Sequence, residues 1–150
     1  MARPHKDAGL AMEATTRLDD AAIAELTGQA ADAARTNLGW RTSWSTVRID
    51  QVNPGTLSLS VRGPGGSPVQ LVFVLEAAPY GDDGLTALRT RITSYRTAQD
   101  TMYGIIPAGP KRMVGLPNYQ KFVSAFCDSL RAADPAAVII PDVRTGTPAP

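Results

Sequence analysis

The stretch that decides the fold is TLSLSVRGPGGSPVQLVFVLEA, residues 56–77. Its first part, Thr56–Arg62, alternates apolar and polar residues, which is typical of a strand with one buried face. The Gly- and Pro-rich segment 63–68 cannot continue a strand and predicts a hairpin. The last part, Val69–Ala77, is apolar on both faces, and such strands are normally covered on both sides. We therefore expect helices on one face of this strand, and a partner subunit, a ligand or the chain termini on the other.

Further strands are predicted on both sides of this hairpin. Residues Trp40–Asp50 are rich in Trp, Thr, Val and Ile, as strands are, and Asn53-Pro54-Gly55 then provides a tight turn. After a second turn at Pro79–Gly84, residues Leu85–Ile106 form either one long strand or two strands joined by a kink near Ala98–Asp100. Together these segments make an antiparallel meander of four or five strands.

Two amphipathic helices are predicted, one before the strands and one after them. Asp19 and Asp20 can cap the first helix, residues 20–37, and Gly39 can end it in a left-handed conformation. The second helix, residues 117–133, begins with a proline, which suits a first helical turn. The apolar stripe of this second helix consists of Tyr119, Phe122, Val123, Phe126 and Leu130.

The predicted fold class is α+β in two layers, with an antiparallel sheet flanked by an N-terminal and a C-terminal helix. We expect a single domain over residues 19–134, a mobile lead-in at 1–18 and a Pro-rich tail at 135–150. A long C-terminal helix across a curved sheet resembles, in outline, the helix-grip family of small-ligand binders. That family usually has more strands and lacks so long an N-terminal helix, so no family is assigned.

Composition narrows the class of protein. The chain has 150 residues, of which 43% are apolar and 19% charged, and its formal net charge is +1. Near charge balance makes nucleic acid an unlikely partner. The single cysteine, Cys127, excludes an internal disulfide, favours a cytoplasmic location and is expected to be an inert, buried side chain. No apolar run approaches the roughly 20 residues of a membrane span, so no membrane partner is expected.

No motif in the chain indicates catalysis or a cofactor. The single histidine, His5, lies in the predicted lead-in, which excludes an internal catalytic triad and a multi-histidine zinc site. Residues 104–109 have the spacing of a phosphate-binding loop, but Pro110 and Lys111 stand where that motif needs Lys and then Ser or Thr. The motif Tyr80-Gly81-Asp82-Asp83 is interpreted as an acidic surface turn. The sequence therefore predicts no metal or cofactor and favours a protein that is not an enzyme.

A local excess of positive charge is the one feature that indicates a site. Residues Leu85–Gly115 contain five basic residues against one acid. On a regular strand, Arg89 and Arg91 would share a face with Tyr95, whereas Arg96 would point the other way. An acidic or anionic partner is the natural expectation for such a segment.

Two interpretations of this basic segment remain open. Lys111 and Arg112 lie in the loop 107–115 just before the last helix, whose amino end favours negative groups. The loop would then be the rim of a ligand site. In the other interpretation, arginines on a solvated sheet face pair across strands with acids such as Glu76. The candidate ligand-binding residues are Arg89, Arg91, Tyr95, Lys111 and Arg112.

Two functional hypotheses follow. The first is a non-catalytic module that binds a small, partly apolar or anionic molecule, or an acidic protein, between Phe122, Phe126, Met102 and the basic loop. The alternative is a structural or interaction protein, either a homodimer or an accessory subunit, that uses the apolar outer face of the sheet. An enzyme and a local nucleic-acid binder rank below both.

Overall fold

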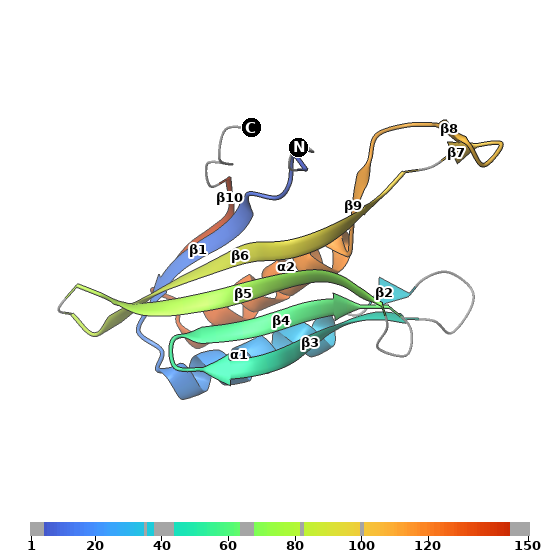
Figure 1. The fold of residues 1–150 in the computed structure, drawn as a ribbon. Helices are drawn as coiled ribbons and strands as arrows, with labels where there is room; N and C mark the ends of the chain where they lie inside the picture. Colours follow the sequence, from blue (N-terminus) through green and yellow to red (C-terminus); the bar gives the residue numbers. More distant parts are fainter. Residues whose placement is uncertain are drawn as a thin grey trace.

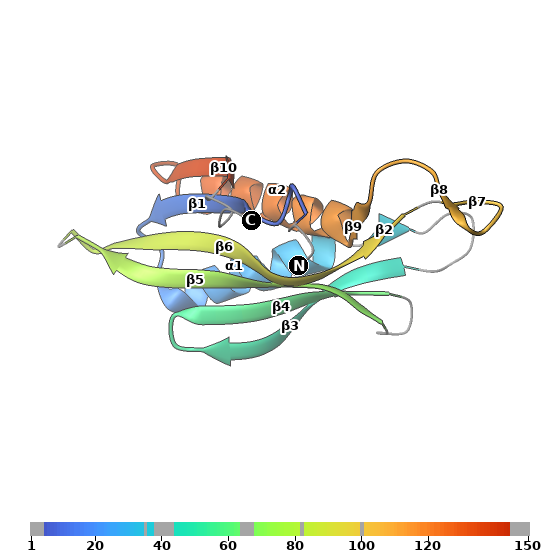
Figure 2. The same ribbon diagram turned by 45° about the horizontal axis from the view of Figure 1, so that its top comes forward.

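The computed structural model describes residues 5–34, 36–37, 44–63, 68–81, 83–99 and 101–144. Two helices, α1 (Asp20–Ala33) and α2 (Leu116–Ala133), contact each other and lie on one face of a long, curved antiparallel sheet (Figures 1 and 2). The predicted two-layer α+β class is confirmed. We call the sheet face that is turned away from the helices the outer face.

The sheet has more strands than predicted. Across the sheet the strands are β10 (Val138–Arg144), β1 (Leu10–Thr16), β6 (Leu85–Ala98), β5 (Val69–Tyr80), β4 (Thr56–Arg62), β3 (Trp44–Asn53) and β2 (Thr36–Asn37). A short strand, β9 (Arg112–Val114), pairs with the end of β6, while β7 (Thr101–Met102) and β8 (Ile106–Pro107) pair with each other. The predicted meander corresponds to β3–β6, and the additional strands come from the chain ends and from the segment after β6.

The predicted lead-in contains an interior strand. β1 lies between β10 and β6, with Met12 fully buried. The pairing of β1 with β10 shifts register between Ala11 and Glu13, and the Met12 amide donates instead to Thr90 Oγ1 on β6 at 2.8 Å. The prediction of a mobile lead-in is wrong for residues 10–16, because this shift breaks the alternation by which a strand is recognised in a sequence.

The predicted Pro-rich tail likewise contains a strand. β10 is an edge strand that pairs with β1, from Val138 opposite Thr15 to Arg144 opposite Leu10, and Ile139 packs against the core. The tail prediction is wrong for residues 138–144. Pro141 does not interrupt the strand, because it lies at the register shift, where no ladder hydrogen bond is required of it.

The turns of the meander follow the prediction closely. Gly55 ends the turn between β3 and β4 with a φ of +76°, and a Cβ atom there would lie 3.1 Å from the Ala77 carbonyl oxygen. β4 and β5 pair as the expected hairpin, although residues 64–67 of its loop lie outside the described residues. The long strand that starts at Leu85 ends at Ala98, in agreement with the second of the two alternatives.

The helix ends show which caps the chain uses. Asp19 Oδ1 accepts a hydrogen bond from the Ala22 amide at 2.8 Å, as predicted for the start of α1. The end of α1 at Ala33 comes earlier than predicted, and Gly39 lies outside the described residues. α2 starts after Gly115, whose φ is +85°, and a Cβ atom at that position would lie 3.2 Å from Leu71 Cβ. Glycine is therefore required both by the backbone and by the close packing of the sheet.

Aromatic side chains fill the space between the two layers. The ring of Phe73 on β5 lies 4.9 Å from that of Tyr119 and 5.1 Å from that of Phe122 on α2. Phe122 and Phe126 are fully buried, whereas Met102 lies on β7, outside the core. The expectation that a ligand is held between these three residues is wrong, because the protein itself fills that position.

Around Val74 the outer face of β5 is covered by side chains of the sheet. Val74 is buried on this face and lies directly opposite Arg91 of β6, whose guanidinium pairs with Glu76 at 2.9 Å. On β4, Arg62 pairs with Asp50 at 3.1 Å and donates to Ser60 Oγ at 3.0 Å. The aliphatic stems of these arginines shield the apolar face, so this part of the sheet needs no partner or ligand as a cover.

Candidate functional site

The structure divides the five predicted site residues between two places. A register shift in the pairing of β5 with β6 puts Phe73 opposite Ile92 and Val72 opposite Ser94. Beyond this bulge the alternation of β6 is reversed. Tyr95 therefore lies opposite Leu71 on the helix side of the sheet, and the prediction that it shares a face with Arg89 and Arg91 is wrong.

Arg89 and Arg91 behave as the second interpretation of the basic segment expects. Both are exposed on the outer face, where Arg89 lies 3.8 Å from Glu13 and Arg91 lies 2.9 Å from Glu76. Exposed pairs of this kind contribute roughly 0–1 kcal/mol each to stability. Arg89 and Arg91 lie in the first half of β6, whereas Arg112 pairs with Ala98 at its far end. No contact among the described residues joins the two pairs of basic residues into one site.

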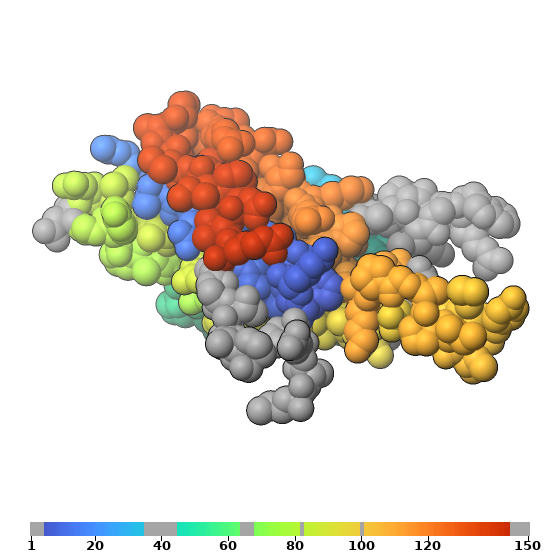
Figure 3. Space-filling model, turned by 90° about the horizontal axis from the view of Figure 1, so that it is seen from above, coloured from blue at the N-terminus to red at the C-terminus, as the bar shows by residue number. Residues whose placement is uncertain are grey.

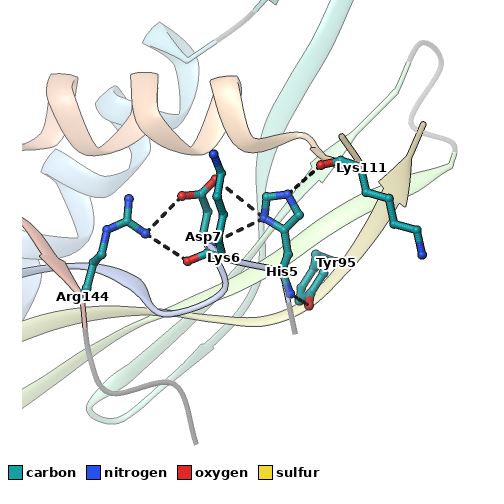
Figure 4. Close-up of polar contacts among 6 residues, drawn as sticks. All are labelled: His5, Lys6, Asp7, Tyr95, Lys111 and Arg144. Atoms are coloured by element: carbon teal, nitrogen blue, oxygen red, sulfur yellow. Dashed lines mark hydrogen bonds and ion pairs between the residues drawn. The ribbon is translucent and has the colours of Figure 1, made fainter. Parts of the chain in front are cut away.

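His5 brings Tyr95 and Lys111 together near the amino end of α2. The His5 amide donates to the Tyr95 hydroxyl at 2.7 Å, and the ring Nε2 lies 3.0 Å from the Lys111 carbonyl oxygen (Figure 4). The Asp7 amide donates to the ring Nδ1 at 3.2 Å. The same Nδ1 atom lies 3.6 Å from Asp7 Oδ2. His5 is thus a nearly buried anchor for loop 107–115, and both of its ring nitrogens are occupied.

Arg144, at the end of β10, completes this cluster. Its guanidinium lies 3.1 Å from Asp7 Oδ1 and 3.0 Å from the carbonyl oxygen of Lys6 (Figure 4). The negative charge of Asp7 is therefore neutralised within the cluster.

A cavity of about 550 Å³ lies where this cluster meets the start of α2. Figure 3 shows the N-terminal segment against the segment that leads into α2. Lys111 and Arg112 of loop 107–115 line the cavity together with His5, Lys6 and Asp7. Among the described lining residues the only acid is Asp7. The remaining lining residues are Ser45, Gln70, Ala98, Pro110 and the segment 113–118.

Two buried polar side chains in the cavity wall each have an oxygen without a hydrogen-bond partner among the described residues. Asn118 and Ser45 are 3% and 2% exposed. Asn118 Nδ2 donates to the carbonyl oxygens of Ala34 at 2.9 Å and Ser45 at 3.1 Å. Neither Asn118 Oδ1 nor Ser45 Oγ bonds to any residue that the structure describes. Buried polar groups are almost always hydrogen-bonded, so these two atoms are available to a molecule that enters the cavity.

The amino end of α2 adds a positive pole to the same wall. Gly115 offers no side chain to cap the helix, and the first turn contains no acidic residue. Free amides and the helix dipole favour a negative group at such an end. The cavity therefore combines cationic side chains, a helix terminus and two buried oxygens that bond to no described residue.

Sequence reasoning missed His5, Ser45 and Asn118. His5 was expected in a mobile segment, and Ser45 and Asn118 lie far apart in the chain with no motif around either. Only the pairing of β3 and the start of α2 brings them to one wall. The predicted aromatic residues Trp40 and Trp44 cannot be added to the site, because the side chains of both lie outside the described residues.

The described part of the chain shows no metal site and no helix that could cross a membrane. No group of three or more His, Cys, Asp or Glu side chains there could hold a metal ion. Cys127 is buried beside Tyr119 in a hollow between α2 and the β1–β10 edge, and burial raises the pKa of its thiol. Asp82 of the acidic turn lies outside the described residues. No helix in the described ranges is long and apolar enough to cross a membrane.

Comparison with known proteins gives no relative: no protein family, no curated protein and no solved structure matches this chain.

Proposed function

We propose that this protein is a non-catalytic binding module that holds a small anionic molecule in the cavity at the amino end of α2. The observation that carries the proposal is the wall of that cavity, where the buried side chains of Asn118 and Ser45 each have an oxygen that bonds to no residue in the described ranges. A volume of about 550 Å³ is within the range of ordinary small-ligand sites, which span roughly 300–1,000 Å³.

Electrostatics indicates the charge of the ligand. Lys6, Lys111 and Arg112 line the cavity, and its one described acid, Asp7, is paired with Arg144. The amino end of α2 adds the partial positive charge of the helix dipole. A carboxylate, phosphate or sulfate group would therefore be favoured at the rim.

The buried wall indicates a second property of the ligand. Asn118 Oδ1 can only accept a hydrogen bond, and Ser45 Oγ can accept one. A hydroxyl group on the ligand could donate to Asn118 Oδ1 and accept from the Ser45 hydroxyl, whereas an amino group could donate to both. The class of molecule that fits best is a small hydroxy or amino acid anion.

The binding test compares glycolate with acetate, two anions of which only glycolate has a hydroxyl group. We expect glycolate to bind more tightly, with NMR shifts concentrated on the amides of residues 109–119 and of Ser45. The double variant Lys111→Ser, Arg112→Ser should lose most of this affinity and keep its melting temperature, because exposed charges contribute roughly 0–1 kcal/mol to stability.

The matched control is Arg89→Ser, Arg91→Ser, which removes the same charge from the outer face. It should leave glycolate affinity nearly unchanged. Shifts scattered over the surface, or an equal loss in both double variants, would show that only general electrostatic attraction is at work.

A second candidate function is that of an interaction protein, and one observation favours it. The outer face carries a groove of about 430 Å³ between β10, β1, β6 and β5. Tyr80, Val138 and Ile140 line this groove and are 57%, 62% and 48% exposed. Exposed apolar side chains gathered in one groove are a common feature of protein interfaces. A homodimer through this groove is the form of the proposal that can be tested first.

A further inference from the structure

The segment between β6 and β9 forms an arm that leaves the body of the protein. β6 ends at Ala98, which pairs with Arg112 of β9, and residues 99–111 run outward and return between these two positions. β7 and β8 pair only with each other, and the hairpin they form projects beyond the amino end of α2 (Figures 1 and 3). Gln99 Nε2 donates to the Gly109 carbonyl oxygen at 2.7 Å and ties the base of the arm. The hairpin contributes no residue to the core.

The tip of this hairpin is apolar and unprotected. Of the nine large apolar side chains that are exposed in the described residues, four lie within residues 102–106. Their exposed fractions are 52% for Met102, 88% for Tyr103, 81% for Ile105 and 50% for Ile106. Exposed apolar side chains that gather at one projecting tip indicate an interaction site, whereas singly scattered ones need no explanation.

The turn at the tip holds a large ring in an unfavourable backbone conformation. Tyr103 and Gly104 have φ values of 55° and 76°, and the Ile105 amide donates to the Met102 carbonyl oxygen at 3.3 Å. Two positive φ values in succession match a type I′ turn, which favours Asn, Asp or Gly at its first central position. Tyr103 is the only described non-glycine residue with a positive φ. A strained aromatic residue that is this exposed suggests that the ring itself is needed there.

The base of the arm is positively charged. Arg96, Lys111 and Arg112 are all exposed where the arm joins the sheet. The chain contains no Asp or Glu from Thr101 to Cys127. Asp100, the nearest acid in the sequence, lies outside the described residues. The arm is thus apolar at its tip and positively charged where it joins the sheet.

We propose that this hairpin docks on an anionic lipid surface, with its tip in the interface and its basic base against the headgroups. Tyrosine suits the boundary between lipid and water, and apolar insertion combined with basic residues is the usual pair of signals for surface attachment. A helix long enough to cross a bilayer is not needed for this mode of binding.

The geometry favours lipid over a protein partner. Met102 and Ile106 lie opposite each other and share one face of the hairpin, and Tyr103 and Ile105 at the turn are more than four-fifths exposed. Apolar groups therefore surround the tip, and a lipid interface can cover all of them at once, whereas a flat protein surface covers one side. A symmetric contact with a second copy would bring the positively charged segments of the two arms together, and their like charges would repel each other.

The test is flotation of the full chain with phosphatidylcholine vesicles, with and without phosphatidylserine. The protein should float with the vesicles that contain phosphatidylserine, and added salt should weaken this binding. The variant Tyr103→Ser, Ile105→Ser should bind these vesicles at least about tenfold more weakly, because it loses the apolar contact. The control Val52→Ser, Val69→Ser, which changes two exposed valines elsewhere, should bind as the unmodified chain does.

Equal binding of the hairpin variant and the unmodified chain would overturn the proposal, as would the absence of binding to either kind of vesicle. Binding of a protein through Tyr103 without any vesicle binding would assign the hairpin to a protein partner and would also overturn it. Melting temperatures identify any variant that fails to fold, and the hairpin variant should melt normally. Both variants keep Lys111 and Arg112, which line the proposed anion cavity, so a difference in flotation between them reports on the apolar tip alone.

Discussion

A closed chain of hydrogen bonds around Tyr119 explains why β1 can shift register inside the sheet. The Met12 amide donates to Thr90 Oγ1 at 2.8 Å, and Thr90 Oγ1 lies 2.6 Å from the Tyr119 hydroxyl, which donates to the Leu10 carbonyl oxygen at 3.3 Å. Burial raises the pKa of Tyr119 to about 12, so its hydroxyl stays protonated. The groups that the register shift would leave unpaired are thereby satisfied.

Asp134 makes a similar connection at the end of α2. Its carboxylate accepts hydrogen bonds from the Arg17 amide at 3.0 Å, from Thr16 Oγ1 at 2.7 Å and from the Ala136 amide at 3.2 Å. These bonds, with the Arg17 amide first, lower the pKa of Asp134. A single carboxylate thus joins the end of β1 to the end of α2.

This arrangement predicts a pH dependence of stability. The folded pKa of Asp134 lies below the unfolded value of about 3.9, so its stabilisation is present above that value and is lost as the pH falls through the folded pKa. The variant Asp134→Asn should therefore melt lower than the unmodified chain above about pH 5, with the difference shrinking below about pH 3. Thermal melts across this range measure it. Asp128→Asn, at an exposed helix position, controls for the loss of one charge, and an equal pH trend in both variants would contradict the assignment.

The elements that the termini contribute depend on one another. β10 pairs only with β1, and Arg144 at its end holds Asp7 and Lys6 beside His5. His5 in turn bonds to the Lys111 carbonyl oxygen on loop 107–115. An edge strand at the C-terminus is therefore linked through the N-terminal segment to the wall of the candidate cavity.

Truncation within β10 tests this dependence. Removal of residues 137–150 exposes the part of the core that Ile139 covers and should cost about 2 kcal/mol or more, or roughly 4–8 °C in melting temperature. A cut after Pro141, which the tail prediction would treat as nearly harmless, also removes Arg144 and its pair with Asp7. It should have an intermediate effect and should shift the NMR signals of His5. A cut after Arg144 keeps all of β10 and serves as the control. Equal melting temperatures of the three truncated chains would exclude a structural role for the strand.

At the scale of the whole molecule, two exposed apolar regions lie toward opposite ends. The groove of the outer face includes Tyr80, at the end of β5, whereas the projecting hairpin follows the other end of the antiparallel strand β6. The anion cavity lies near the hairpin, at the start of α2. The groove is therefore a separate surface, and its occupation would leave the cavity and the hairpin accessible.

A homodimer through the groove is expected if the second candidate function holds. The rim carries the pairs Glu13–Arg89 and Glu76–Arg91, whose alternating charges can complement a second copy related by a two-fold axis. Native mass spectrometry should then give twice the chain mass of 15.9 kDa. Tyr80→Ser, Ile140→Ser should restore the monomer, whereas the control Val52→Ser, Val69→Ser should not. A monomeric unmodified chain at high concentration would exclude this dimer.

The sequence predicts those features of the molecule that depend on local patterns. The alternation in β4, the turn at Gly55, the cap at Asp19 and the apolar stripe of α2 each require only a few neighbouring residues. Because local conformation and side-chain period determine them, the two-layer α+β class and the position of loop 107–115 beside α2 could be inferred without coordinates.

What only the tertiary structure decided are the features that depend on contacts between distant residues. β1 and β10 owe their place to pairing across most of the chain, and the bulge in β6 moves Tyr95 away from Arg89 and Arg91. His5, Ser45 and Asn118 meet at one cavity only after the sheet and α2 have packed. By itself the sequence determined the central strands β3–β6, the turn at Gly55 and the two helices, because those choices are local. The partners of each strand, and hence the candidate site, follow from burial and hydrogen bonding summed over the whole fold.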